Sequence, residues 1–243
     1  MLFEDYSLII TNSIHRICTE QGGKILQAAE YVADVIETDG LIYIFGCGHS
    51  GMLACEGFYR AGGLVNVSPV FCEPLMLHES AVESSRLEKC SGYAKKLWEI
   101  YQFEQRDMVF CFSTSDKNAV PVEFAAHITS QGIPTVGVCS SSYFSQEVNN
   151  ACKKHLHEVC AMYIDNCVPF GDGCLSIDNS GINMAPLSTI TSTFILNSIL
   201  SEGALMAHKR GIEVPVYLSG NIPGGSEYNR TLIERYSSRI RYL

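Results

Sequence analysis

Two short segments of the sequence place hydrogen-bond donors where an anion could bind. The first, Gly-Cys-Gly-His-Ser-Gly at residues 46–51, follows an apolar run and precedes a stretch with helical spacing. Glycines at such a place permit a tight turn and close backbone approach, while Ser50 can cap a helix and hydrogen-bond an anion's oxygens. The segment lacks the third glycine of a dinucleotide fingerprint and the Gly-Lys-Ser/Thr ending of a nucleotide P-loop. Taken alone, it fits an ordinary capped strand-to-helix turn equally well.

The second segment, Cys-Phe-Ser-Thr-Ser-Asp-Lys-Asn at residues 111–118, also leaves an apolar run and opens a helical stretch. It gathers three hydroxyls, one amide and one lysine at a predicted helix start, and such donors fit phosphate oxygens. Serine-rich turns are common, but two donor loops at neighbouring strand ends predict a phosphate site. Its candidate residues are Gly48, Ser50, Ser113, Thr114, Ser115, Lys117 and Asn118. Lys117 fits a solvated helix-start lysine equally well.

Four side chains are candidates for acid–base chemistry beside this phosphate site. His78 and Glu79 are adjacent in a polar segment near a predicted strand end, and histidine titrates close to neutrality. Instead of a catalytic role, His78 and Glu79 could have a surface or subunit-contact role. His49, inside the first donor loop, could neutralise phosphate charge, relay a proton or simply face solvent. Glu56 follows Ser50 on the same predicted helix and either faces the substrate or is a buried, paired carboxylate, which is the preferred interpretation.

The sequence predicts no metal and no other cofactor. Its eleven cysteines form none of the close Cys-x-x-Cys pairs of a zinc site. His155 and His157 alternate along a predicted strand without a third ligand nearby in the sequence. His208 ends a basic predicted helix, where a cation favours the helix dipole, and is interpreted as structural.

Short apolar runs alternate with helical patterns along most of the chain, and these elements must position the two loops. The pattern predicts strands at residues 41–45, 65–71, 108–112, 135–139 and 157–164, and helices at 50–61, 93–101, 120–131 and 187–209. Such alternation implies right-handed crossovers and a mainly parallel sheet with helices on both faces. The expected fold class is therefore α/β, doubly wound.

The two ends of the chain differ from this core. Residues 6–37 predict a pair of helices, with Gly22 and Gly23 as the break. The tail contains Pro215 and Pro223, which predict a loop before a short basic helix at 230–241. No linker or fixed-period repeat is present, so we expect a single domain over 1–243. Its parts are the N-terminal helices (1–39), the core (40–211) and the C-terminal tail (212–243).

Composition excludes several classes of protein. The chain has 243 residues, 47% of them apolar, which suffices for a hydrophobic core without disulfides. A net charge of −9 argues against a general nucleic-acid binder, because phosphate backbones require dense Lys/Arg surfaces. The odd number of cysteines, several inside apolar runs, and a start without a signal peptide predict the cytoplasm. No membrane association is expected, since Asn197 and Glu202 interrupt the longest apolar stretch.

The pair of loops resembles the signature of SIS (sugar isomerase) domains, which hold phosphosugars on a Gly-x-Gly-x-Ser and a Ser-x-Ser loop. The resemblance extends to residues 73–79 and to the helix after Ala185, which is similar to that of arabinose-5-phosphate isomerases and adds Ser188 as a substrate contact. The N-terminal helices resemble phosphoheptose isomerases, and the Gly-Asn-Ile-Pro-Gly-Gly tail resembles a separate SIS group. Similarity covers residues 41–225. It implies a flavodoxin-like three-layer sandwich and a homodimer or homotetramer.

The acid–base residues of these families are only partly matched. The arabinose-5-phosphate isomerases carry a lysine where this chain has His49, a glutamate where it has Lys117, and a histidine where it has Ile222. Their histidine after the second strand is matched by His78. Phosphoheptose isomerases carry a histidine and a glutamate where this chain has Glu56 and Arg60.

The resemblance implies a small-molecule sugar phosphate as ligand and aldose–ketose isomerisation through an enediol as the reaction. That reaction requires one base and one group that polarises the carbonyl or relays a proton. Two alternatives remain open. One is a non-catalytic phosphosugar-binding or sensing protein, and the other is a lyase that cleaves an ether-substituted sugar phosphate.

Overall fold

The computed structural model describes residues 1–177 and 181–243 and confirms the doubly wound α/β class. Its centre is a five-stranded parallel sheet in the order β2-β1-β3-β4-β5. The strands are β1 (Ile42–Gly46), β2 (Val67–Pro69), β3 (Met108–Phe112), β4 (Thr135–Cys139) and β5 (Met162–Asp165). Every residue of β1, β3 and β4 is buried, which explains why these strands are nearly continuous apolar runs in the sequence.

The order of the strands reverses at β1, and this reversal locates the ligand-binding edge of the sheet. The chain runs from β1 to β2 on one side and then crosses to β3 on the other. Gly46 pairs with Phe112, so β1 and β3 end at the same level. In open α/β sheets ligands bind outside the carboxyl ends of the strands at such a switch point. The two donor loops therefore start side by side.

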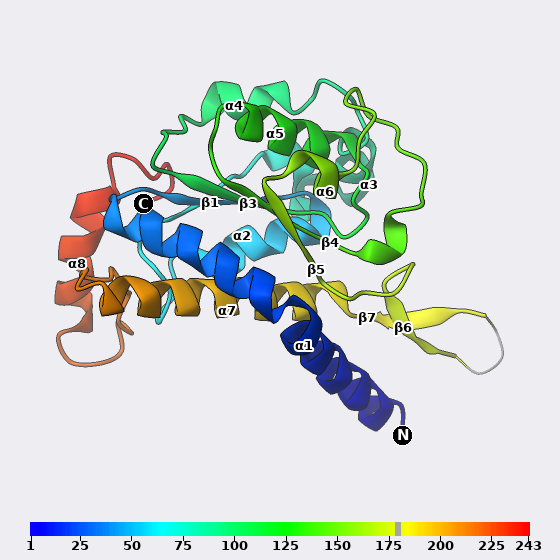
Figure 1. Cartoon of the computed structure of the whole chain (residues 1–243), viewed down its shortest axis with the longest axis horizontal. Coiled ribbons are helices and arrows are strands. Elements are labelled where there is room, and N and C mark those ends of the chain that lie inside the picture. Colours follow the sequence, from blue (N-terminus) through cyan, green and yellow to red (C-terminus); the bar gives the residue numbers. More distant parts are fainter. Residues whose placement is uncertain (178–180) are drawn as a thin grey trace.

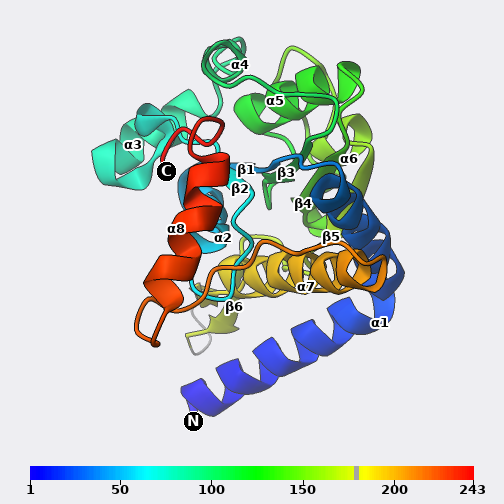
Figure 2. The same ribbon diagram turned by 90° about the vertical axis from the view of Figure 1, so that its left-hand side faces the viewer.

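Helices cover both faces of the sheet (Figure 1). Along β1, Ile42 and Ile44 pack into one layer, and Tyr43 and Phe45 into the other. The first layer holds α1 (Leu2–Glu37), α2 (Met52–Gly57) and α7 (Ser188–Lys209). The second holds α3 (Leu77–Leu87), α4 (Lys95–Ile100), α5 (Ala119–Ser130), α6 (Leu156–Val159) and α8 (Gly225–Tyr236). Figure 2 shows α4 and α5 on the opposite side of the strands from α7, with α8 running past the edge of the sheet.

The predicted pair of N-terminal helices is wrong, because residues 2–37 form one helix. Gly22 and Gly23 lie inside α1, where a Cβ on either would meet nothing within 4 Å. A glycine in a helix interior costs only about 1 kcal/mol, and the packing of α1 on α7 outweighs that cost. At Gly203 of α7 an added Cβ would lie 2.5 Å from the Val32 side chain, so the two helices approach closely. The first turns of α1 project beyond the sheet (Figure 1).

Two segments near the candidate residues differ from the sequence-based expectation. The segment carrying His78 and Glu79, expected to be a loop, is the first turn of α3. The strand expected at 157–164 instead begins as α6, with β5 following. The His155 backbone N–H donates to a Glu158 carboxylate oxygen at 2.7 Å, and the His157 N–H donates to Asp116 at 3.0 Å. These bonds satisfy the free donors of a helix start and override the alternating pattern.

The remaining differences concern boundaries and one addition. The helix expected at 50–61 is a 3₁₀ turn, η1 (Gly48–Gly51), followed by α2, and the tail helix α8 starts five residues earlier than expected. Two further 3₁₀ turns are η2 (Glu73–Leu75) and η3 (Ser141–Tyr143). An unpredicted antiparallel hairpin, β6 (Gly173–Ser176) and β7 (Asn183–Pro186), lies beside the start of α1.

Among the described residues, α7 alone is long and apolar enough to be a candidate membrane span by length and composition. In this structure its buried side chains, including Ile195, Leu196 and Ile199, pack into the first layer of the core. Core helices of globular folds pass the same test.

Candidate functional site

A hollow lies outside the carboxyl ends of β1 and β3, at the switch point of the sheet. Its empty volume is about 800 Å³ and it opens to solvent. Both donor loops, α3, the turn η3 and the start of α7 contribute to its lining, which includes Gly48, His49, Ser50, Glu88, Ser113, Thr114, Ser115, Asn118, Tyr143, Asp172 and Ser188. The structure thus brings together all the predicted phosphate-binding residues except Lys117.

Glycines give the first loop its shape. A Cβ on Gly46 would lie 2.5 Å from the backbone carbon and oxygen of Ser50, so the turn closes only without a side chain there. Gly48 has φ +56°, in the left-handed region that glycine adopts at little cost. The Ser50 N–H donates to the Cys47 carbonyl at 3.0 Å. This tight turn places His49 and Ser50 in the lining.

Ser113 is the most unusual residue of the second loop. Its side chain is 3% exposed, and its hydroxyl has no hydrogen-bond partner among the described residues. Its backbone is held firmly, because the N–H donates to the Val138 carbonyl and the carbonyl accepts from the Asp116 N–H, both at 3.0 Å. A buried polar group without a partner costs about 1–3 kcal/mol. Ser113 lines the hollow while its hydroxyl oxygen is closed to solvent, so a rotation of this short side chain would bring an unpaired donor to a ligand there.

The neighbouring polar groups are already partly engaged. Thr114 Oγ1 accepts from Asn166 at 3.2 Å, which leaves its own proton to donate. Asn118 Nδ2 donates to Glu88 Oε1 at 2.9 Å. Ser188 Oγ donates to Asp172 Oδ2 at 2.7 Å, and the Ser188 N–H donates to Asp172 Oδ1 at 2.8 Å, so Asp172 caps α7. A second, much smaller cleft lies where both donor loops meet the first turn of α7.

The hollow contains two carboxylates and, within the described chain, no lysine or arginine. Burial raises the pKa of Glu88, although the hydrogen bond from Asn118 partly offsets this effect. Its carboxyl group therefore exchanges its proton closer to neutrality than an exposed glutamate does. That property suits a general base or acid.

The acid–base candidates predicted from the sequence are dispersed. His49 lines the hollow, but His78 and Glu79 do not. The His78 and Glu79 side chains are 68% and 53% exposed, with 3.6 Å between His78 Nε2 and Glu79 Oε1, while Leu77 and Ala81 of the same helix face the hollow.

Glu56 and Lys117 also lie outside the lining. Glu56 pairs with Arg60 and accepts from Asn197 Nδ2 at 3.1 Å, so it is paired as the preferred interpretation expected, but its side chain is 27% exposed and therefore only partly buried. Lys117 belongs to the second donor loop but does not line the hollow, and its carbonyl accepts from Asn150 at 3.0 Å.

Sequence reasoning missed Glu88, Asp172 and Tyr143. Glu88 is the C-cap of α3, and the sequence gives no signal that separates it from the other glutamates of that region. Asp172 has φ +66° in the turn before β6, and an Asp-Gly pair signals such a turn but not its place at the hollow.

Comparison with known proteins gives consistent results. The SIS domain family matches residues 5–140. A UPF0309 protein of Geobacillus thermodenitrificans is 38% identical over 243 residues, which is 100% of this chain and 98% of the relative. A UPF0309 protein of Halalkalibacterium halodurans is 43% identical over 218 residues, covering 89% and 87% of the two chains.

Two solved structures share the fold. The sugar isomerase domain of an RpiR transcription factor from Sphaerobacter thermophilus superimposes with a TM-score of 0.52 at 12% identity, covering 98% of each chain. The phosphoheptose isomerase GmhA from Neisseria gonorrhoeae gives a TM-score of 0.50 at 14% identity, covering 86% of this chain and 100% of its own. At these identities the likeness concerns the fold.

Proposed function

The chain belongs to the SIS domain family, and from that membership we propose that it binds a phosphorylated sugar in the hollow at the ends of β1 and β3 and isomerises it. The name of one protein with this fold, phosphoheptose isomerase, supports the choice of substrate class. The observation that carries the proposal is the buried, unpartnered hydroxyl of Ser113 at the wall of the hollow.

In the proposed complex the phosphate is held by the two donor loops. Ser113 and Thr114 each have a hydroxyl proton to donate, and Ser50 and Ser115 line the same hollow. Hydrogen bonds from neutral donors to a charged phosphate contribute about 1.5–3 kcal/mol each. Lys117 is not among these contacts in our proposal, because it lies outside the lining.

Glu88 is the proposed base, in place of His78 and Glu79. Its carboxylate removes the proton from the carbon next to the carbonyl while His49 gives a proton to the carbonyl oxygen, forming the enediol. Glu88 then returns its proton to the neighbouring carbon, and His49 takes back a hydroxyl proton, so the protons balance. The raised pKa of Glu88 and the position of both residues in the lining support these roles.

A sensing protein is the second candidate. Lys117 and Ile222 occupy places where related isomerases carry acid–base groups, and His78, which matches a third such group, does not line the hollow. A lyase acting on an ether-substituted sugar phosphate would use the same phosphate site.

One experiment separates these functions. The purified protein is incubated in D₂O with a panel of aldose and ketose phosphates, followed by NMR, and binding is measured by calorimetry. The isomerase is supported if the wild type incorporates deuterium at the carbon beside the carbonyl and the Glu88→Gln variant does not, although the variant still binds the sugar phosphate. Binding without exchange supports the sensor, and release of a hydroxy acid supports the lyase. Absence of binding to every sugar phosphate overturns the proposal.

We also propose a homo-oligomer. Phe3 and Leu8 on the projecting start of α1 are 66% and 60% exposed, and Ile182 and Met184 of the adjacent hairpin are 61% and 49% exposed. Clustered exposed apolar side chains of this kind mark protein–protein contacts. All eleven cysteines are free, which supports a reducing, cytoplasmic location.

A further inference from the structure

Three potential metal ligands lie close together where the second donor loop meets the start of α6. They are Asp116, which ends the Ser-Thr-Ser-Asp turn, and His155 and His157 at the start of α6. One ligand atom from each lies within 4.8 Å of the others. His157 Nδ1 is 2.6 Å and His155 Nδ1 is 3.1 Å from the same Asp116 oxygen, Oδ2. The third ligand missing from the sequence pattern is therefore supplied by a residue 39 positions before His155.

The cluster is shielded but reachable. Asp116 is fully buried, while the side chains of His155 and His157 are 12% and 20% exposed. The other Asp116 oxygen, Oδ1, accepts the His157 backbone N–H at 3.0 Å, which fixes the carboxylate. The His157 ring stacks on Phe144 with 3.8 Å between ring centroids, which holds that ring as well. A backbone hydrogen bond thus preorganises Asp116, and stacking on a ring outside the cluster preorganises His157.

One nitrogen in the cluster is not accounted for. His155 Nδ1 is buried and has no hydrogen-bond partner among the described residues, because its approach to Asp116 lacks hydrogen-bond geometry despite the short distance. Buried nitrogens of this kind are rarely left unpaired. This nitrogen lies close to the Asp116 oxygen without pointing at it, so its lone pair is available to a cation held between the three side chains.

We propose that Asp116, His155 and His157 bind a divalent transition-metal ion of the Zn²⁺ class. In a tetrahedral Zn²⁺ site with bonds of about 2.0–2.1 Å, neighbouring ligand atoms are about 3.3 Å apart. The 3.1 Å distance from His155 Nδ1 to Asp116 Oδ2 is close to this value, and the 2.6 Å distance from His157 Nδ1 must lengthen as the ion replaces the shared proton. Water completes the coordination.

The role of this ion is structural. None of the three side chains lines the hollow, but Asp116 lies one residue after Ser115, and its carbonyl accepts the Leu156 N–H at 2.7 Å. The ion therefore joins the donor loop to α6. This inference is independent of the sugar phosphate proposal, because ion binding is measured without any sugar.

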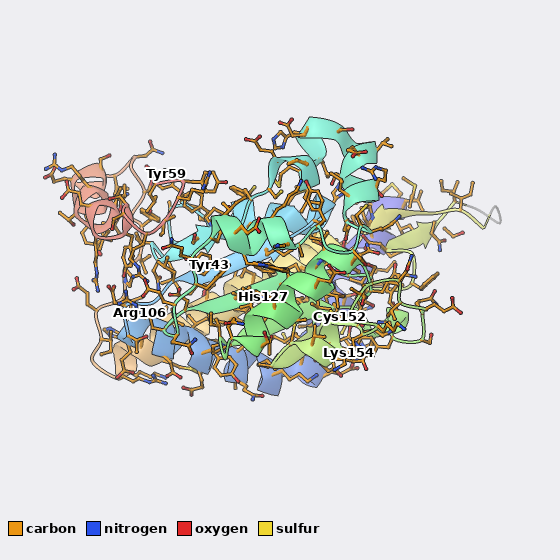
Figure 3. All side chains as sticks on the ribbon, turned by 90° about the horizontal axis from the view of Figure 1, so that it is seen from above. Tyr43, Tyr59, Arg106, His127, Cys152 and Lys154 are labelled. Carbon is orange, nitrogen blue, oxygen red and sulfur yellow. The ribbon has the colours of Figure 1, made fainter. Side chains whose placement is uncertain are left out.

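The test uses the metal alone. Metal-free full-length protein is titrated with Co²⁺, followed by visible absorption, and with Zn²⁺, followed by calorimetry and thermal unfolding. Because eleven cysteines also bind these ions, the decisive comparison is between variants. His155→Gln and His157→Gln remove ligands, and His127→Gln is the matched control. His127 is stacked on Trp98 and does not belong to the cluster; Figure 3 shows its place on α5.

We expect one tight ion per wild-type and His127→Gln chain, a visible Co²⁺ spectrum and a Zn²⁺-dependent rise in Tm. Loss of an outer-sphere partner already weakens metal binding 10–100-fold, so each ligand variant should bind more than about 100-fold more weakly. Equal Co²⁺ spectra and Zn²⁺ affinities in all four proteins would place the ion on cysteines and overturn the proposal. So would the absence of a tight ion in the wild type.

Discussion

Replacing Ser113 with alanine tests the proposed phosphate cradle, because stability and affinity should respond differently. In most proteins, removing a buried hydroxyl loses a hydrogen bond and lowers stability. Here the Ser113 hydroxyl has no partner in the described structure, and the backbone of the residue is anchored on both sides. The loop should therefore keep its shape in Ser113→Ala.

The expected magnitudes follow from that geometry. An unpaired buried hydroxyl costs about 1–3 kcal/mol, part of which the alanine variant recovers, so its free energy of unfolding should be unchanged or up to about 1 kcal/mol higher. Bound phosphate should lose one charge-assisted hydrogen bond of about 1.5–3 kcal/mol. Affinity for the sugar phosphate should then fall about 10- to 150-fold.

Ser140→Ala is the matched control. Ser140 is also a buried serine at a strand end, but its hydroxyl donates to the Val168 carbonyl at 2.5 Å and does not line the hollow. This variant should lose about 1 kcal/mol of stability and keep its affinity. Urea unfolding and calorimetry measure both quantities. If Ser113→Ala loses as much stability as Ser140→Ala and keeps its affinity, the reasoning about the cradle fails.

Three further predictions concern the loop, the carboxyl group and the projecting helix. Gly46→Ala should lower the free energy of unfolding by about 1–3 kcal/mol and abolish sugar phosphate binding, because the added Cβ meets backbone atoms. Gly22→Ala, where the Cβ meets nothing, should raise the free energy of unfolding by about 1 kcal/mol. Urea unfolding that finds Gly46→Ala as stable as Gly22→Ala would contradict the structure. Because burial raises the pKa of Glu88, folding favours its protonated form, so the wild type should lose stability relative to Glu88→Gln as pH rises from the ordinary value of 4.5 through the raised pKa. A difference in unfolding free energy that is flat across this range would show that Glu88 is not desolvated. Phe3→Glu with Leu8→Glu should convert the oligomer to monomer in light scattering; an unchanged mass would exclude the start of α1 from the interface.

The sheet was predictable because its strands are buried on both faces. Met108–Phe112 and Thr135–Cys139 match their predicted ranges, since a parallel strand covered by two layers has a nearly continuous apolar sequence. The single helix α1 was not predictable from local signals. A glycine pair predicts the end of a helix, and only the packing of α1 on α7 explains why the helix continues through it.

The placement of the two donor loops was predictable for a related reason. Residues that immediately follow parallel, buried strands must lie at the same edge of the sheet. Ser50 and Ser113 could therefore be assigned to one site from the sequence alone. Glu88, Asp172 and the cluster at Asp116 depend instead on how α3, the hairpin turn and α6 fold back over that edge. These tertiary placements have no local signature in the sequence.

The charges in the hollow constrain how an anion can bind there. The chain is acidic, and the described lining has two carboxylates and no lysine or arginine, so general electrostatic attraction does not favour a phosphate. Binding must then come from fixed neutral donors whose cost of desolvation was met when the protein folded, and Ser113 is the clearest of these. Exposed cations act over a distance and are screened by salt, whereas short hydrogen bonds from buried hydroxyls are not. The same carboxylates that weaken attraction for a bare anion are the groups that can accept hydroxyls and exchange protons, so the composition of the hollow suits a sugar ester better than free phosphate.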